Sequence, residues 1–320
     1  MPTKMITAIA KIIKEGRRFL VASHENPDGD ALASTLALAN ALREMGKEAV
    51  AYNVDGVPDG FAFLPGASAV VRELEGREPF DACFVLDAGE LRRAGNHLRS
   101  LCRTLINIDH HPFSEDFGEI YFVDDKASAT GALIYRILKG MDHPISDAVA
   151  PCLYTAILSD TGSFRYSNAD PEAFRIAAEM VRGGVDPWSV ASGLYESQDE
   201  KRLRLLARSL ATLTTSSCGR LASVSVTTAM MAETGAGPEH TDGFVNYPRS
   251  IRGVEVGLFF RQIAPNAFKV GFRSKGAVDV GALARELGGG GHHNAAGAVV
   301  EGTLEQVRSA VLKQVEGLLG

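Results

Sequence analysis

The sequence has no uninterrupted apolar stretch long enough to cross a membrane. A spanning helix needs about 20 consecutive apolar residues, and no run here approaches that length. The first residues, MPTKMITAIAKIIKEGRR, mix Lys and Arg with isolated apolar residues, as an amphipathic helix does and a secretory signal peptide does not. We therefore expect no membrane partner.

Cysteine is scarce and scattered. The four cysteines, Cys83, Cys102, Cys152 and Cys218, stand far apart and form no CxxC pair. This spacing argues against a structural zinc site and against a disulfide framework. We interpret all four as reduced core residues and expect a cytoplasmic location.

Aromatic residues and excess positive charge are also lacking. Aromatics make up 7% of the chain and are not interleaved with basic residues, which argues against a long single-strand nucleic-acid track. The net charge of −6 argues against binding long duplexes. The charge is uneven, since residues 1–195 hold 27 acidic and 19 basic residues, whereas residues 196–320 hold 12 and 14.

The chain of 320 residues is long enough for two domains of the usual size of about 100–200 residues. In its first part, strand-length apolar runs (RFLVAS, EAVAYNV, DACFVLD, TLINID) alternate with helical patterns. The helical patterns are ALASTLALANALREMG, SATGALIYRILKGM, SDAVAPCLYTAILSD and PEAFRIAAEMVRGG. This alternation predicts an α/β domain over residues 1–195 with a doubly wound, mostly parallel sheet.

The remaining residues predict a smaller α/β domain after a linker helix. ESQDEKRLRLLARSLATLT has the helical period, and we place the linker helix at 196–214 and the second domain at 215–320. LASVSVTT, GVEVGLFFRQ and AFKVGFRS are strand candidates, the last two joined as a hairpin by Pro265-Asn266. DVGALARELG predicts a helix, GGGG a loop, AAGAVVEG a strand and TLEQVRSAVLKQVEGLL a closing helix.

Carboxylates and histidines follow four apolar runs in the first domain. SHENPDGDALAS places His24, Asp28 and Asp30 after the first run, VLDAGE places Asp87, IDHH places Asp109, His110 and His111, and AILSDTGSF places Asp160. Strand ends of a parallel sheet converge on one edge, where ligands bind. A single Asp in such a position is usually a helix cap or turn residue, but four segments together favour a shared partner.

A divalent cation is a suitable partner for this set. Aspartate is costly to bury unpaired, and carboxylate oxygens with imidazole suit Mn²⁺ or Mg²⁺. Two such ions can activate water and stabilise the leaving oxygen of a phosphoryl displacement. A serine hydrolase is not favoured, because GxSxG is absent.

The segments HENPDGDA, LDAG, DHH and SDTGSF resemble, in order and spacing, the four motifs of the DHH phosphoesterase family. FRSKGAVDVGALARELGGGGHHNAAG resembles the glycine-rich signature of its associated C-terminal domain, so the likeness covers roughly residues 15–300. The resemblance implies two Mn²⁺ or Mg²⁺ ions. One would be held by His24, Asp28 and Asp87, and the other by Asp30, Asp87, His110 and Asp160. It further implies that Asp109 orients His110 and that His111 faces the scissile phosphate.

The glycine-rich segment predicts a nucleotide-binding site in the second domain. Glycines let a backbone approach an anion, and Arg forks onto phosphate oxygens, although a flexible loop after a helix is the plainer alternative. Our candidates for binding the substrate are Arg273, Ser274, Gly290, Gly291 and His292.

The compact two-domain members that this chain resembles are oligoribonucleases (nanoRNases) and 3′-phosphoadenosine 5′-phosphate (pAp) phosphatases. We therefore expect a metal-dependent phosphoesterase that hydrolyses short RNA, pAp or both. A soluble phosphodiesterase of cyclic or linear dinucleotides would share the same metal core, and a non-catalytic nucleotide-binding module is a third hypothesis. A homodimer is compatible with the sequence.

Overall fold

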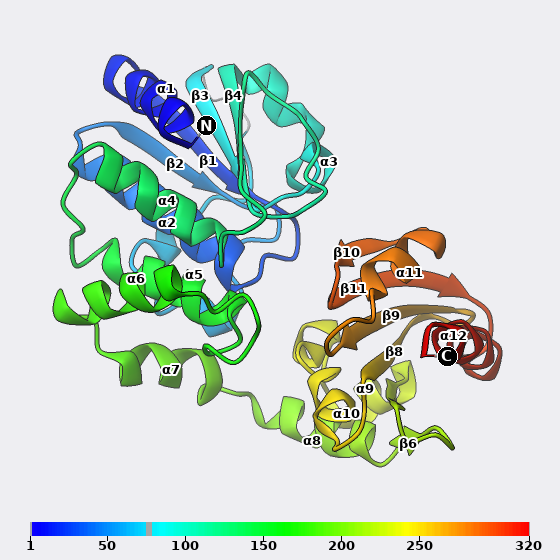
Figure 1. The fold of residues 1–320 in the computed structure, drawn as a ribbon. Coiled ribbons are helices and arrows are strands. Elements are labelled where there is room, and N and C mark those ends of the chain that lie inside the picture. The colour runs from blue at the N-terminus through cyan, green and yellow to red at the C-terminus, as the bar shows by residue number, and fades with distance from the viewer. Residues whose placement is uncertain (1, 75–78, 320) are drawn as a thin grey trace. The chain divides into compact units, whose positions relative to one another are not determined.

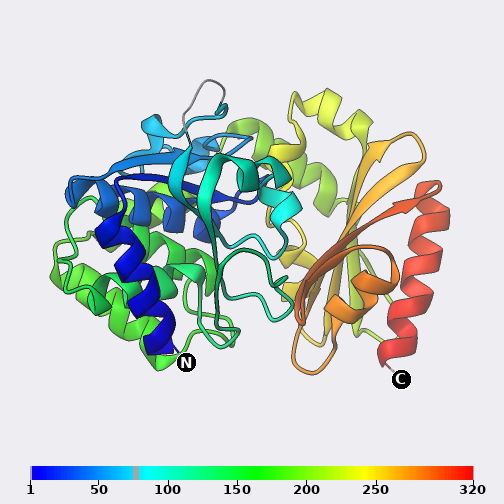
Figure 2. The same cartoon turned by 90° about the horizontal axis from the view of Figure 1, so that it is seen from above.

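The computed structural model describes residues 2–74 and 79–319, and the chain forms two compact units, Met1–Ser197 and Gln198–Gly320. Each unit contains its own sheet and its own hydrophobic core (Figures 1 and 2).

The first unit is built on a five-stranded parallel sheet in the order β2-β1-β3-β4-β5. Its strands are β1 (Arg18–Ser23), β2 (Glu48–Tyr52), β3 (Phe80–Leu86), β4 (Cys102–Asp109) and β5 (Ile120–Val123). The predicted parallel α/β fold is confirmed, and four of the strands match the apolar runs. The fifth strand was not predicted, because its four residues lie at the sheet edge and only Phe122 among them is buried.

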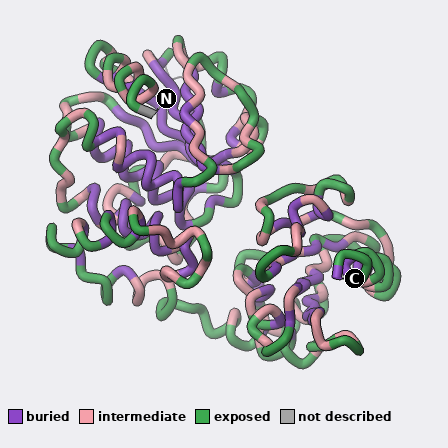
Figure 3. The backbone as a smooth tube through the Cα atoms, in the orientation of Figure 1, coloured by how far each residue is buried: buried purple, intermediate pink, exposed green. Residues whose placement is uncertain are grey.

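One face of this sheet is covered by layered α-helices, and the other by short helical segments. The helices are α1 (Pro2–Glu15), α2 (Gly29–Glu44), α3 (Leu91–Ala94), α4 (Thr130–Gly140), α5 (Ala150–Asp160), α6 (Pro171–Arg182) and α7 (Pro187–Tyr195). The 3-10 segments are η1 (Asp59–Phe61), η2 (Ala67–Ala69) and η3 (Asn96–Leu101). Helix α2 contacts β1, β2 and β3 on one side and α4 and α5 on the other, so every residue from Gly29 to Leu42 is buried (Figure 3). The opposite face contacts η3 and α3.

Two glycines bring α2, α4 and α5 into close contact. A Cβ atom at Gly29 would lie 2.3 Å from Ser159 Oγ on α5, and one at Gly131 would lie 2.5 Å from Ala156 Cβ on the same helix. Any larger residue would push these helices apart. The glycine of the PDGD segment is therefore required by packing, and it brings the start of α2 beside the end of α5.

The second unit is built on a six-stranded mixed sheet in the order β10-β11-β9-β8-β7-β6. Its strands are β6 (Thr214–Thr215), β7 (Leu221–Val226), β8 (Val256–Ala264), β9 (Ala267–Ser274), β10 (Gly290–His292) and β11 (Ala295–Glu301). Its helices are α8 (Glu200–Leu210), α9 (Thr228–Thr234), α10 (Asn246–Ser250), α11 (Val280–Glu286) and α12 (Leu304–Leu319), with the 3-10 segment η4 (Pro238–Thr241). The predicted hairpin is confirmed as the antiparallel pair β8–β9.

The two faces of this sheet are covered differently. Helices α11 and α12 lie on one face of the sheet (Figure 2). Val307, Val311 and Val315 of α12 and Leu283 of α11 form a buried core with Val270 and Phe272 of β9. On the other face, Leu205 of α8 and Phe244 form a core with Val224, Val226 and Phe259 of β7 and β8. That second core includes no residue of β9, β10 or β11.

Two predictions for this part of the chain need correction. The helix predicted as a linker over 196–214 is shorter and packs on β7, α9 and η4 within the second unit, with Leu205 buried. The GGGG segment is not simply a loop, because Gly290–His292 form β10, paired antiparallel with β11. Local propensity does not predict a strand here, because glycine is depleted in strands.

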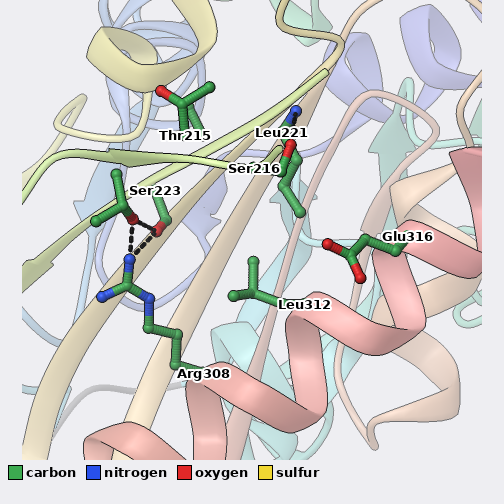
Figure 4. A pocket seen from close by; sticks show the side chains of 9 residues that line it. Thr215, Ser216, Leu221, Ser223, Arg308, Leu312 and Glu316 are labelled. Carbon is green, nitrogen blue, oxygen red and sulfur yellow. Dashed lines mark hydrogen bonds between the residues drawn. The ribbon is translucent and has the colours of Figure 1, made fainter. Parts of the chain in front are cut away.

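A small hollow lies where β6 and β7 meet α12. It has a volume of about 110 Å³, and Arg308 reaches across it to donate hydrogen bonds to Thr214 and Ser223 (Figure 4). Ligand pockets usually measure about 300–1,000 Å³, so we assign no nucleotide to this hollow.

No helix in the described ranges is both long and apolar enough to span a bilayer.

Candidate metal centre

Three strand ends and one helix end bring the predicted ligands together in the first unit. His24 follows β1, Asp87 follows β3, and Asp109 is the last residue of β4, immediately before His110 and His111. The fourth segment reaches the cluster from a helix and not from a strand, because Asp160 is the last residue of α5, within the predicted helical pattern SDAVAPCLYTAILSD. The contact between α2 and α5 at Gly29 explains why this helix end belongs to the same edge.

Asp87 lies at the centre of the cluster. Its Oδ2 is 3.9 Å from His24 Nε2, and its Oδ1 is 3.5 Å from His110 Nε2 and 3.5 Å from His111 Nδ1. Its backbone has a φ of 57°, a left-handed conformation that non-glycine residues rarely adopt. Such strain is common where a side chain must be aimed at a functional site.

The orientation of two histidines leaves Nε2 directed into the cluster. Nδ1 of His24 lies 2.7 Å from the carbonyl oxygen of Glu25, and Nδ1 of His110 lies 3.2 Å from that of Ala127. A carbonyl can only accept, so Nδ1 carries the proton and Nε2 the lone pair. Nε2 of His110 lies 3.8 Å from Asp30 Oδ2 and 3.6 Å from Asp160 Oδ2.

The start of α4 supports the carboxylates from behind. Backbone N–H groups of Thr130 and Gly131 donate to Asp30 at 2.6 and 3.0 Å, and Ser34 Oγ donates to it at 2.8 Å. The hydroxyl of Thr130 donates to Asp87 Oδ1 at 3.0 Å. Thr130 therefore contacts both buried carboxylates, a role that sequence reasoning missed.

Asp28 and Asp160 contribute from the rim. Asp28 is exposed and caps α2 by accepting a 3.0 Å hydrogen bond from the Ala31 N–H. The helix-cap interpretation of this residue is thus correct, and it coexists with a place beside His24 and Asp87. Asp160 Oδ2 accepts a 3.1 Å hydrogen bond from Asn168, whose side chain also reaches the Ser128 carbonyl.

Asp109 supports both histidines that follow it, but not as predicted. It accepts hydrogen bonds from the backbone N–H of His110 at 2.7 Å and of Gly89 at 2.8 Å. The imidazole that it holds is that of His111, whose Nδ1 lies 2.6 Å from Asp109 Oδ1. The ring of His110 is held instead by Ala127. The repeated histidine concealed this difference in the sequence.

The crowding of carboxylates perturbs their protonation. Burial, with added repulsion from Asp30, raises the pKa of Asp87 well above its usual value of 3.8. Burial likewise raises the pKa of Asp30 to about 7, although His110 opposes this shift. Burial would lower the pKa of His110, but Asp160 and Asp30 outweigh it and raise the pKa. The cluster therefore holds excess negative charge that a cation would neutralise.

The donor set suits a divalent cation. Oxygen and nitrogen donors from His24, Asp28 and Asp87 lie within 4.8 Å of one another, and so do those from Asp30, Asp87 and His110. Four carboxylates with two imidazoles whose Nε2 faces inward match the preferences of Mn²⁺ and related ions. The shared residue of both groups is Asp87.

In the second unit, the structure places two predicted binding residues in one row. Arg273 on β9 and His292 on β10 each pair with Ala295 on β11, so the three lie abreast across the sheet. Directly opposed residues of antiparallel strands project from the same face. This face is opposite the one that buries Phe272 against α12.

Three glycines form the next row on that face. Gly271, Gly297 and Gly290 pair across β9, β11 and β10. A Cβ atom would meet nothing closer than 3.8 Å at Gly271 and 3.4 Å at Gly297, and nothing within 4 Å at Gly290. None of the three has a positive φ. Neither packing nor backbone conformation requires glycine here, so the row leaves a strip of sheet bare of side chains.

The other two candidates in this unit contribute to the local fold. Ser274 is buried, donates to the Val278 carbonyl at 2.7 Å and accepts from Asn294 at 2.8 Å. Gly291 has a φ of 136°, and a Cβ atom there would lie 2.5 Å from the Ala295 carbonyl oxygen. Both residues therefore hold the strand ends that carry Arg273 and His292.

Comparison with known proteins agrees with this geometry. A family model described as "DHH family, N-terminal domain" matches residues 18–157, and the "DHHA1 domain" matches residues 223–320. The "Bifunctional oligoribonuclease and PAP phosphatase NrnA" of Thermus thermophilus is 34% identical over 96% of this chain and 92% of its own length. The Bacillus subtilis protein of that name is 27% identical over 92% of this chain and 93% of its own.

A solved structure extends the comparison to the fold. The crystal structure of an exopolyphosphatase-related protein from Bacteroides fragilis superposes with a TM-score of 0.91 and 28% identity, covering 98% of this chain and 96% of that one. Three findings therefore support the same family: the two family models, the similarity to the Thermus protein, and the convergence of the four motifs on one cluster. The chain belongs to the DHH phosphoesterase family.

Proposed function

We propose that this protein is a metal-dependent phosphoesterase that hydrolyses short oligoribonucleotides and pAp, using two divalent cations, Mn²⁺ or Mg²⁺. The observation that carries the proposal is the position of Asp87 within reach of both His24 and His110. One carboxylate between two imidazole-containing groups is the arrangement that a pair of ions needs. The names of the Thermus and Bacillus relatives support the choice of substrates.

The ions would be held by two overlapping sets of side chains. His24, Asp28 and Asp87 would hold one, and Asp30, Asp87, His110 and Asp160 the other. When bound, such ions supply a water of lowered pKa and Lewis-acid stabilisation of phosphoryl oxygens. Histidine ligands favour Mn²⁺ over Mg²⁺, which prefers oxygen alone.

Other residues of the chain would orient the ligands, contact the scissile phosphate and hold the nucleotide. Thr130 and the start of α4 fix the carboxylates of Asp30 and Asp87. Asp109 fixes the ring of His111 through Nδ1, so the opposite nitrogen, Nε2, would meet the scissile phosphate or donate a proton to the leaving oxygen. Arg273 and His292 would hold a second phosphate or the sugar of the nucleotide.

A substrate panel tests the proposal. Protein loaded with Mn²⁺ is incubated with pAp, pApA, cyclic di-AMP, RNA of two to five nucleotides and a 20-nucleotide RNA, and the products are separated by chromatography. We expect cleavage of pAp and the short RNAs, little cleavage of the 20-mer, and loss of activity in EDTA that Mn²⁺ restores.

Other outcomes identify the alternatives. Cleavage confined to cyclic di-AMP or pApA would indicate a dinucleotide phosphodiesterase. Binding of nucleotides without hydrolysis of any ester would indicate a non-catalytic binding module. Full activity in excess chelator would end the two-metal proposal.

A further inference from the structure

Arg93 in α3 is joined to two of the metal-ligand segments. Its backbone carbonyl accepts a 2.8 Å hydrogen bond from the N–H of Glu25, the residue after His24. Its Nη1 donates at 3.1 Å to the carbonyl of Ala88, the residue after Asp87. Two ligand segments that are distant in the sequence therefore meet at this one arginine.

The guanidinium lies at the edge of the carboxylate cluster without being neutralised by it. Its Nη1 lies 3.1 Å from the carbonyl oxygen of Ala88, which stands between Asp87 and Gly89, whose N–H donates to Asp109. Among the described residues, no carboxylate forms an ion pair with Arg93, and its side chain is half-buried. Neighbouring Arg92 differs, since it is 69% exposed and pairs with Glu90.

The Arg93 guanidinium has further N–H donors that could bind a ligand. A guanidinium has five N–H donors, and one of them is used by Ala88. An arginine without a carboxylate partner at this edge should stabilise the fold no more than a neutral side chain would. An anion that enters the cluster would satisfy the remaining donors in the fork geometry that suits phosphate oxygens.

Charge balance at the site points the same way. The four carboxylates of the proposed ligand set and Asp109 surround the centre, in a unit that is acidic overall. Two divalent ions roughly cancel these carboxylates and leave the negative charge of a phosphate ester unbalanced. A fixed cation at the rim would compensate the charge that grows on the non-bridging oxygens during displacement.

We propose that Arg93 is a catalytic residue that contacts the non-bridging oxygens of the scissile phosphate from within the first unit. This proposal rests on the proposed phosphoesterase function and adds to it a residue outside the metal ligands and outside the glycine-rich segment. It also separates two adjacent arginines, of which one binds substrate and the other lies on the surface.

The test compares Arg93→Ala with Arg92→Ala in the Mn²⁺-loaded full chain. Rates are measured on pAp and on bis-p-nitrophenyl phosphate, a small ester with no nucleoside for the second unit to hold. We expect kcat/KM of Arg93→Ala to fall by roughly tenfold to a hundredfold or more on both esters, as for one or two lost charge-assisted hydrogen bonds. Arg92→Ala should stay within about twofold, as a surface substitution does.

Two further variants separate phosphate contact from support of the fold. Arg93→Gln can still donate to the Ala88 carbonyl but has no charge, so it should be as impaired as Arg93→Ala. Arg93→Lys should recover part of the rate, and millimolar guanidinium should partly rescue Arg93→Ala. Circular dichroism and bound Mn²⁺ should be unchanged in all of them. Wild-type rates in Arg93→Gln, or loss of Mn²⁺ in every variant, would overturn the proposal.

A binding measurement keeps this proposal distinct from the function on which it rests. Inorganic phosphate is titrated calorimetrically into Mn²⁺-loaded wild type and Arg93→Ala. If the wild type cleaved none of the esters, the proposed function would fail, but a tenfold weaker phosphate affinity in Arg93→Ala would still support the contact. Equal affinity in the two proteins would refute it.

Discussion

The hydroxyl of Thr130 donates a 3.0 Å hydrogen bond to Oδ1 of Asp87, while the backbone N–H of the same residue donates to Asp30 at 2.6 Å. One residue at the start of α4 thus orients two buried carboxylates that come from different segments. Mutating a residue that holds a metal-binding side chain in this way commonly lowers metal affinity by about 10–100-fold.

Replacing Thr130 by valine should therefore weaken metal binding without unfolding the protein. The variant keeps the shape of the side chain and the N–H bond to Asp30, but Asp87 loses its donor. We expect the Mn²⁺ affinity, measured by calorimetry, to fall by about 10–100-fold. Thr130→Ser should retain it.

A buried threonine elsewhere in the first unit provides the control. Thr155 Oγ1 has no hydrogen-bond partner among the described residues, so Thr155→Val removes no contact. We expect Thr155→Val to bind Mn²⁺ like the wild type. Equal Mn²⁺ affinity in Thr130→Val and Thr155→Val would mean that the Thr130 hydroxyl has no influence on the metal centre.

Asp87→Asn should abolish hydrolysis and yet stabilise the metal-free protein. Asparagine tolerates the left-handed backbone of this position better than most residues, and it replaces a carboxyl group whose ionisation burial and the neighbouring carboxylates oppose. In EDTA, we expect the melting temperature to rise by a few degrees. With Mn²⁺ present, the order should reverse, because ligand binding stabilises only the protein that binds tightly. A lower melting temperature than the wild type in EDTA would contradict the strain argument.

The same substitution should change how stability depends on pH. The pKa of Asp87 is raised on folding, so between 3.8 and the raised value the folded protein holds a proton that the unfolded chain loses. Metal-free wild type therefore loses stability as pH rises through that window, and Asp87→Asn lacks this loss. The advantage of Asp87→Asn in EDTA should be larger at pH 8 than at pH 5. An equal advantage at both pH values would show that the charge is not responsible.

Arg136 should matter for stability and not for chemistry. It joins α4 to Asp124 after β5 and to Glu172 of α6, and its side chain is 22% exposed. Arg136→Met removes the guanidinium that pairs with both of these partly buried carboxylates, which should lower the free energy of unfolding by about 2 kcal/mol. Arg175 also contacts Glu172 but is 65% exposed, so Arg175→Ala should cost less than about 0.5 kcal/mol. Urea denaturation of the metal-free variants measures both changes in the free energy of unfolding. Similar changes for Arg136→Met and Arg175→Ala would contradict the predicted difference between the two arginines.

The parallel sheet and most of the ligand set were predictable from the sequence because both depend on local patterns. Apolar runs specify strands, and His24, Asp87 and Asp109 lie at or directly after their ends. The role of Thr130 was not predictable, because it depends on which helix packs behind the carboxylates. Arg93 could not be distinguished from Arg92 by sequence, since only the folded α3 shows that Arg93 bonds to the Ala88 carbonyl whereas Arg92 pairs with Glu90.

The second unit shows a different limit. The segment that contains Gly290 and Gly291 could be identified by its composition, but glycine propensities predict a loop where the structure has β10. Pairing with β11 overrides that preference, and the register then brings Gly271 and Gly297 beside Gly290. Strand register depends on contacts between distant segments, so a row across three strands could not be predicted from one chain.

Arg273→Ala and His292→Ala should weaken nucleotide binding while leaving the chemistry intact. Contacts made equally in the ground and transition states raise KM and leave kcat little changed when they are lost. We expect KM for pAp to rise by roughly tenfold to a hundredfold for Arg273→Ala. Hydrolysis of bis-p-nitrophenyl phosphate should barely change. Lys269→Ala, on the same face of β9, is the control and should keep the KM of the wild type. Loss of the small-ester activity in folded Arg273→Ala would move this residue into the catalytic machinery.

Gly297→Val tests whether the strip bare of side chains receives the nucleotide. Valine suits a strand, and its Cβ would meet no atom closer than 3.4 Å, so the folded protein should be as stable as the wild type or more so. The isopropyl group would nevertheless project from the middle of the Gly271–Gly297–Gly290 row. This is where we expect the sugar or base to lie against the sheet. KM for pAp and for RNA dinucleotides should rise at least tenfold, while bis-p-nitrophenyl phosphate should be cleaved at the rate of the wild type. Val299→Ala changes an exposed residue on the same strand and face, outside the row, and should leave both substrates unaffected. If folded Gly297→Val kept the nucleotide KM of the wild type, the nucleotide would have to bind elsewhere, and the glycines of this row would need another explanation.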